Sequence, residues 1–144
     1  MNMRTLYKAI VWLGMMSGSA LASADVYVIV NQDNPLTQLS AEQVERIFLL
    51  KAKRFENGDG AYPVNQAEGS KARIAFNKLV LDRSDQQLKY YWSRKMFSGG
   101  DKPPPVLLSD DDVEDYVAQQ EGGIGYLLHA PSQKDVKVVL TVKN

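Results

Sequence analysis

The chain has 144 residues, with 17 basic and 17 acidic side chains and no cysteine. This balance gives no basic surface for nucleic acid or for an anionic membrane. The lack of cysteine excludes disulfides, thiolate metal sites and a cysteine nucleophile, so an apolar core must stabilise the fold.

Residues 1–24 have the pattern of a secretory signal peptide. Arg4 and Lys8 precede an apolar run that ends in Ala-Ser-Ala before Asp25. The run is short for a membrane span and is interrupted by Gly and Ser, so we expect cleavage and no membrane span afterwards. The mature chain 25–144 then has 120 residues and a net charge of −2, which suits one domain. The expected location is the periplasm, with a secreted or surface location as the alternative.

Short runs of β-branched and aromatic residues predict strands that alternate with helical patterns. The strand run at 26–30 is continuously apolar and predicts a buried central strand, whereas Lys137 interrupts the run at 136–142 and predicts a less buried or edge strand. The other predicted strands are 62–64, 105–108 and 124–127. Alternation of strand and helix predicts an α/β layer fold, and no boundary divides residues 25–144.

Each predicted helix begins at a serine that can serve as N-cap. Gln43 and Gln87 stand three residues after two of these serines and complete a capping box in each case. Gly pairs follow two of the helical patterns and end them. The four capping serines are Ser40, Ser70, Ser84 and Ser109.

The polar residues do not form a recognisable catalytic or metal-binding set. His129, the only histidine, has no serine or carboxylate at a catalytic spacing, so we expect a structural or solvent-facing role. Asp110, Asp111 and Asp112 fall in the first turn of the helix that Ser109 caps, where they complement the helix dipole, and they lack the spacing of a calcium loop. We therefore expect no catalytic residue, no bound metal and no cofactor.

A strand-to-helix turn between residues 65 and 73 is the candidate binding site. Free backbone N–H groups at such a turn attract oxyanions. Ser70 can add a hydroxyl, while Lys71 and Arg73 can add positive charge. Ser70 as an ordinary N-cap without a ligand is the alternative. The candidate anion-binding residues are Glu68, Gly69, Ser70, Lys71 and Arg73.

Three sequence pieces in one order carry a family resemblance. They are "IFLLK" at 47–51, "EGSKAR" at 68–73 followed by Phe76, and "GGIGYL" at 122–127. This order resembles the phosphate-binding proteins of bacterial phosphate ABC transporters, in the type 2 periplasmic binding protein superfamily, over nearly all of the mature chain. The resemblance implies a single three-layer α/β domain, with a mixed sheet and helices on both faces. It also implies phosphate or a related oxyanion as ligand and a membrane transporter or sensor as partner.

Gly69, Ser70, Arg73 and Phe76 match the family's anion loop unchanged, and several neighbours differ. Glu68 replaces an aspartate, and the resemblance implies that its carboxylate accepts a proton from a protonated oxyanion. The remaining differences are Gln66 for an arginine, Lys71 for a glycine and Ala72 for a threonine.

The length adds a further expectation, because full members of the family close two domains over the anion and 120 residues suffice for one. An open half-cleft exposes its ligand to water, so we expect weak binding or a partner surface that completes the cleft.

Three functions follow from these patterns. The first is an exported solute-binding-like protein that binds phosphate or a related oxyanion weakly and is related to the substrate-binding component of phosphate ABC transport. The second is a non-catalytic periplasmic interaction or sensory module with a decayed anion site. The third, an enzyme acting on a phosphorylated solute, lacks a base, a nucleophile and a metal set.

Overall fold

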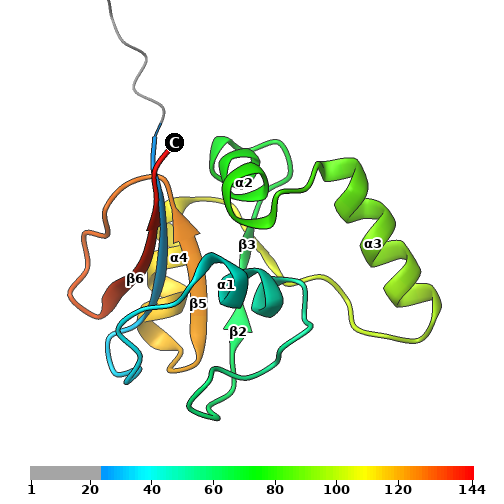
Figure 1. The fold of residues 1–144 in the computed structure, drawn as a ribbon. Coiled ribbons are helices and arrows are strands. Elements are labelled where there is room, and N and C mark those ends of the chain that lie inside the picture. Colours follow the sequence, from blue (N-terminus) through cyan, green and yellow to red (C-terminus); the bar gives the residue numbers. More distant parts are fainter. Residues whose placement is uncertain (1–23) are drawn as a thin grey trace, which may run out of the picture.

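The computed structural model describes residues 24–144, so the predicted signal peptide lies outside the described residues except for Ala24. No helix of this part of the chain is both long and apolar enough to cross a membrane. Six strands and five helical segments follow one another along these residues (Figure 1). They are β1 (Val26–Asn31), α1 (Ala41–Phe48), β2 (Tyr62–Pro63), β3 (Asn65–Gln66), α2 (Lys71–Phe76), the π-helical turn η1 (Asn77–Leu81), α3 (Asp85–Phe97), β4 (Val106–Leu107), α4 (Asp110–Gln119), β5 (Gly123–Leu127) and β6 (Val136–Val142).

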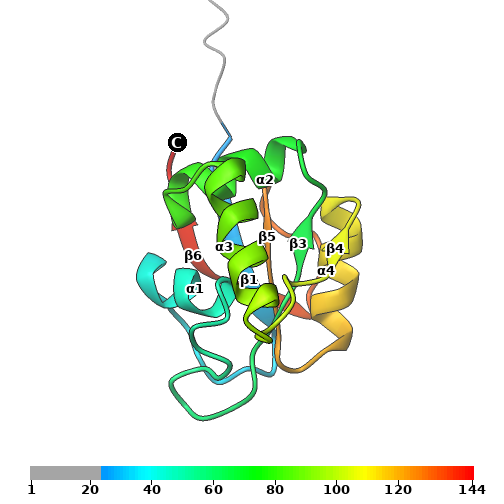
Figure 2. The ribbon, with the colours of Figure 1, turned by 90° about the vertical axis from the view of Figure 1, so that its right-hand side faces the viewer.

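The main sheet is mixed and has the strand order β2-β5-β1-β6. Figure 2 labels three of these strands, β5, β1 and β6, which lie behind α3 in that view. β1 pairs antiparallel with β5 and β6, and β2 pairs parallel with β5. The prediction of 26–30 as a central strand and of 136–142 as an edge strand is therefore confirmed.

The strand predicted at 62–64 lies in the main sheet, with β2 at Tyr62–Pro63, and the residues directly after it pair elsewhere. The backbone N–H of Val64 still donates to the Ile124 carbonyl at 3.0 Å, but that of Asn65 donates to the Pro105 carbonyl at 2.8 Å. β3 then pairs with β4 in a separate two-stranded ribbon. The chain thus leaves the main sheet just before the candidate loop.

Alternate residues of β1 supply two apolar cores on opposite faces of the sheet. Val26, Val28 and Val30 belong to the cluster that includes residues of α1, α2 and α3. Ile29 belongs to the second cluster, which contains Val113 and other residues of α4. Helices therefore cover both faces, as the three-layer prediction requires.

Three aromatic rings fix α1 and α2 against β5. Phe76 stacks on Tyr126 with ring centroids 3.9 Å apart and planes within 3°. Phe48 packs against Phe76 at 4.7 Å and against Tyr126 at 5.8 Å, tilted in both cases. Both rings of the stack are fully buried, so α2 has one position over the sheet.

All four predicted serine caps are confirmed. Ser40 and Ser84 form complete capping boxes with their glutamines, and the side chains of Ser70 and Ser109 accept the backbone N–H three residues later. These bonds satisfy amides that have no partner inside the helix, and each cap contributes about 1 kcal/mol.

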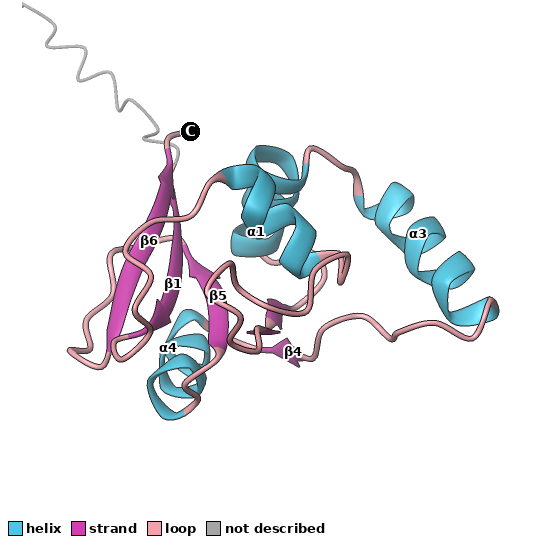
Figure 3. Ribbon diagram, turned by 60° about the horizontal axis from the view of Figure 1, so that its bottom comes forward, coloured by secondary structure: helices cyan, strands magenta, loops and turns pink. Residues whose placement is uncertain are grey.

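α3 stands away from the sheet as an arm (Figures 1 and 3). Its inner side buries Leu88 and Trp92 in the first core cluster. The hydroxyl of Tyr91 donates to the Leu49 carbonyl at 2.6 Å, and the Lys95 ammonium donates to the same carbonyl at 3.2 Å. A cation at the C-terminal end of α1 is electrostatically favourable, so Lys95 helps to anchor the arm.

Gly125 allows α4 to approach β5 closely. A Cβ atom at this position would lie 2.4 Å from Cγ1 of Val113 and 3.3 Å from Cγ2 of Val64. Both valines are buried, so neither has free space to move into.

Gly125→Ala is therefore expected to destabilise the fold by about 1 to 3 kcal/mol, because overpacking forces a shift of helix or strand. Urea unfolding followed by circular dichroism measures this. Adding Val113→Ala removes the clashing methyl, so the double variant is expected to lose less stability than the sum of the two single losses. Simple additivity would contradict this account.

Candidate anion-binding site

The candidate loop is a tight turn between β3 and α2. The Ser70 amide donates to the Ala67 carbonyl at 3.0 Å and closes the turn. Gly69 has a φ of 81°, a left-handed conformation that favours glycine, and a Cβ there would meet no atom within 4 Å. The space beside Gly69 is open.

The start of α2 leaves backbone donors free. The Ser70 hydroxyl accepts from the Arg73 amide at 3.2 Å, and the Ser70 carbonyl accepts from the Ile74 amide at 3.0 Å. Among the hydrogen bonds of residues 24–144, none uses the amide of Gly69, Lys71 or Ala72 as a donor. Ser70 is thus an N-cap, and free amides of the kind that bind oxyanions lie on either side of it.

The two cations of the loop occupy different positions. Arg73 is half-buried, and its Nη1 donates to the Gln66 carbonyl at 3.2 Å. Its buried Nε has no hydrogen-bond partner among the described residues. Lys71 is exposed and forms no ion pair within residues 24–144. Lys71 is therefore the cation of the loop that is free to meet a solute.

Glu68 is paired with the arm. Its carboxylate lies 2.6 Å from the Lys89 ammonium of α3, with both side chains more than half exposed. The hydrogen bond and the positive charge of Lys89 hold the pKa of Glu68 below its usual value. The Glu68 carboxylate is thus ionised near neutral pH and is already paired with the Lys89 ammonium.

A buried polar network lies behind the loop. The Tyr126 hydroxyl donates to Oδ1 of Asn65 and accepts from the Gln66 amide at 3.1 Å. Burial raises the pKa of Tyr126, so its hydroxyl keeps the proton that it donates. The Gln66 side chain turns inward, and its Nε2 donates to Oδ1 of Asp110 at 2.7 Å and to the Tyr126 carbonyl at 2.9 Å.

Sequence reasoning missed this network, because its members lie far apart in the chain. Gln66 stands 44 residues from Asp110 and 60 from Tyr126. The only local signal was a polar Asn-Gln pair at the end of a predicted strand. Gln66 and Asp110 hold the end of β3 and the start of α4 together, so they position the loop from behind.

Asp110 also reaches the single histidine. Its Oδ2 accepts from the Leu128 amide at 3.1 Å and lies 3.1 Å from Nε2 of His129. The sequence predicts only that Asp110 complements the dipole of its helix. The structure adds a link from its carboxylate to the end of β5. The hydrogen bond to the Ala130 carbonyl and then the Asp110 charge raise the pKa of His129, although partial burial opposes them.

A hollow of the described surface lies along α3, away from the loop. It is an open groove of about 970 Å³ along α3, lined by Tyr90, Arg94, Phe97 and their neighbours. Its lining comes from α3 and the residues next to it, so it is a helix face rather than a cleft. Residues 24–144 contain no group of three His, Asp or Glu side chains placed to hold a metal ion.

No protein-family model matches the sequence, and no curated protein shows a significant sequence match. Solved structures do share the fold. An ABC-type phosphate transport receptor from Vibrio cholerae is similar with a TM-score of 0.63 and 18% identity over 82% of this chain. A putative phosphate ABC transporter substrate-binding protein from Clostridium perfringens, solved with bound phosphate, is similar with a TM-score of 0.65 and 18% identity over 83% of this chain. A possible phosphate binding protein from Planctomyces limnophilus is similar with a TM-score of 0.58 and 12% identity over 82% of this chain.

These similarities confirm the expected α/β fold and the resemblance to phosphate-binding proteins. The match covers 47%, 46% and 42% of the three solved chains, respectively. This chain therefore spans under half the length of the structures that it resembles.

The raised pKa of His129 predicts a pH dependence of stability. A folded-state pKa above the unfolded value of about 6.5 means that protonation favours the folded state. The stabilisation is fully present below about pH 6.5 and is lost as the pH rises through the folded-state pKa.

An NMR titration of His129 in residues 25–144 is expected to give a pKa above 6.5, and Asp110→Asn is expected to lower it because the negative charge is removed. His129→Gln serves as the stability control, since it is expected to flatten the slope of unfolding free energy between about pH 6 and pH 8. A measured pKa of 6.5 or below would contradict the interpretation.

Proposed function

We propose that this domain, which has the fold of phosphate-binding proteins, binds phosphate or a related oxyanion weakly at residues 68–73. The observation that carries the proposal is the loop itself, where the free amides of Gly69, Lys71 and Ala72 stand next to two cations. Amides at a helix N-terminus and a nearby ammonium together favour a negatively charged oxygen. Ser70 contributes its hydroxyl, whose second lone pair and proton remain usable beside the cap.

The proposed affinity is low for two reasons. Gln66 is a neutral side chain, and its amide group is already bound to Asp110, so it adds neither charge nor a free donor for the ligand. The loop also lies on one domain that spans under half of the two-lobed length expected for the family, and water then screens each contact. Arg73 is only partly available, because one of its nitrogens holds the Gln66 carbonyl.

The setting that we propose is the periplasm, after export through the segment 1–24. The solved relatives are a phosphate transport receptor and a transporter substrate-binding protein, which supports a non-catalytic role next to a membrane transporter or sensor. In this role the domain presents the anion or its own surface to a partner that completes the cleft.

A periplasmic interaction or sensory module with a decayed anion site is the second candidate. The ion pair between Glu68 and Lys89 favours it, because the carboxylate proposed to select a protonated anion is already neutralised. The exposed aromatic rings of Tyr90 and Phe97 on α3 favour it as well.

Calorimetric titration of residues 25–144 with phosphate, at constant ionic strength, tests the first proposal. In a separate thermal unfolding measurement, phosphate at about 100 times its dissociation constant is expected to raise the free energy of unfolding by about 2.7 kcal/mol. Lys71→Gln removes the exposed charge and is expected to weaken binding roughly three- to tenfold, with the fold unchanged.

Two matched controls, Lys78→Gln for Lys71→Gln and Ser84→Ala for Ser70→Ala, separate binding from stability. Lys78→Gln removes an exposed charge from η1 and is expected to leave affinity unchanged. Ser70→Ala and Ser84→Ala each remove a cap of about 1 kcal/mol, but only the first is expected to lower affinity. Phosphate also stabilises proteins non-specifically, and that effect is equal in all variants. Absence of heat at about 10 mM phosphate, where millimolar binding is still detectable, would refute the proposal.

A further inference from the structure

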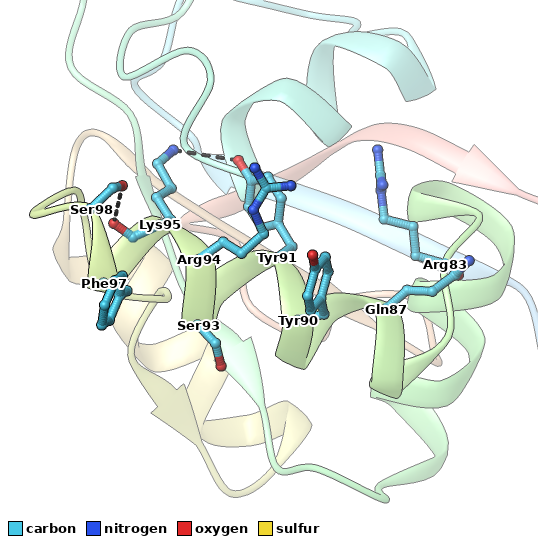
Figure 4. A pocket seen from close by; sticks show the side chains of 9 residues that line it. All are labelled: Arg83, Gln87, Tyr90, Tyr91, Ser93, Arg94, Lys95, Phe97 and Ser98. Atoms are coloured by element: carbon cyan, nitrogen blue, oxygen red, sulfur yellow. Dashed lines mark hydrogen bonds between the residues drawn. The ribbon is translucent and has the colours of Figure 1, made fainter.

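The outer face of α3 is apolar, basic and uncovered. Phe97 is 95% exposed and Tyr90 is 66% exposed, one seven residues after the other on the same side of the helix. Figure 4 shows Phe97 and Ser93 pointing away from Lys95, which extends toward α1. Arg94 lies 5.6 Å from the centroid of the Tyr90 ring. We call Tyr90, Arg94 and Phe97 the arm face.

The inner side of α3 already has its partners, so the arm face is not needed to hold the helix. Leu88 and Trp92 are buried, and Tyr91 and Lys95 bind carbonyls at the end of α1. Arg94 takes part in no ion pair within residues 24–144. Two exposed aromatic rings beside an unpaired cation are typical of an interface centre.

A second surface of the chain has the complementary character. Leu108 is 80% exposed and Val106 is 48% exposed, and they lead directly into the first turn of α4. The exposed carboxylates of Asp111 and Asp112 follow and have no hydrogen-bond or ion-pair partner among the described residues. We call Val106, Leu108, Asp111 and Asp112 the acidic face.

We propose that the arm face docks on the acidic face of a second copy of this chain. The aromatic rings of one copy cover Leu108 and Val106 of the other, and Arg94 meets the two aspartates. Because each copy carries both faces, a two-fold pair forms the contact twice. The two faces of one chain flank the linker 98–105, whose three prolines keep it extended and hold the faces apart.

The size of the contact predicts a weak pair. A helix of 13 residues is about 20 Å long, and a strip about 10 Å wide along it has an area near 200 Å². Four such strips bury on the order of 800 Å², which is below the standard size of a stable interface and suits a concentration-dependent pair. The proposal is independent of anion binding, because no residue of the loop 68–73 takes part.

Sedimentation velocity on residues 25–144, which contain both core clusters, tests the pairing. We expect a shift from monomer to dimer between about 5 µM and 500 µM, weakened by added salt because the charges are exposed. Tyr90→Ser with Phe97→Ser is expected to raise the dissociation constant at least about tenfold. Lys134→Glu, a charge reversal at an exposed site outside both faces, is expected to leave it unchanged.

A charge exchange identifies the partner surfaces. Arg94→Glu alone, and Asp111→Lys with Asp112→Lys alone, are each expected to abolish pairing by repulsion. An equal mixture of the two variants is expected to pair again, because each arm then meets a face of opposite charge. Thermal melting verifies that every variant is folded. A protein that stays monomeric at all concentrations, a dimer insensitive to the aromatic variant, or a mixture that does not pair would each overturn the proposal.

Discussion

The buried Tyr126 side chain is the interaction on which the rest of the candidate site depends. Its ring stacks on Phe76 and so holds α2 over the sheet. Its hydroxyl binds both Asn65 and the Gln66 amide, and so holds the end of β3. One residue of β5, an inner strand of the main sheet, therefore fixes both ends of the candidate loop. Burial keeps the phenol protonated, so this anchor is constant over the physiological pH range.

The polar side chains around the loop are largely engaged with one another. Gln66 faces Asp110, Arg73 holds a backbone carbonyl, and Glu68 pairs with Lys89. What has no partner within residues 24–144 is a set of backbone amides and the ammonium of Lys71. An oxyanion would be met mainly by dipoles and one flexible charge rather than by a bidentate guanidinium, which is consistent with weak rather than tight binding.

The arm gives the molecule a second surface with no role in the fold. α3 is anchored by its inner side and by Lys95, while its outer aromatic rings remain in water at a cost in free energy. The acidic start of α4 has a local reason to exist, since its charges complement the helix dipole. Two of those carboxylates also have no partner within residues 24–144, so one sequence feature serves both helix stability and the proposed contact.

The sequence by itself determined the local elements. Serine caps, the apolar run of β1 and the Lys137 interruption in β6 act within a few residues, so helix starts and strand types could be predicted. The order of three motifs indicated the phosphate-binding-protein fold, and the solved structures confirmed it.

Only the tertiary structure decided the division of 62–66 between two sheets, the inward turn of Gln66, the pairing of Glu68 with Lys89 and the exposure of the arm face. Each of these depends on contacts between residues far apart in the chain or on which side of a helix lies against the core. Local propensity does not encode such contacts, because they arise only when the layers pack together.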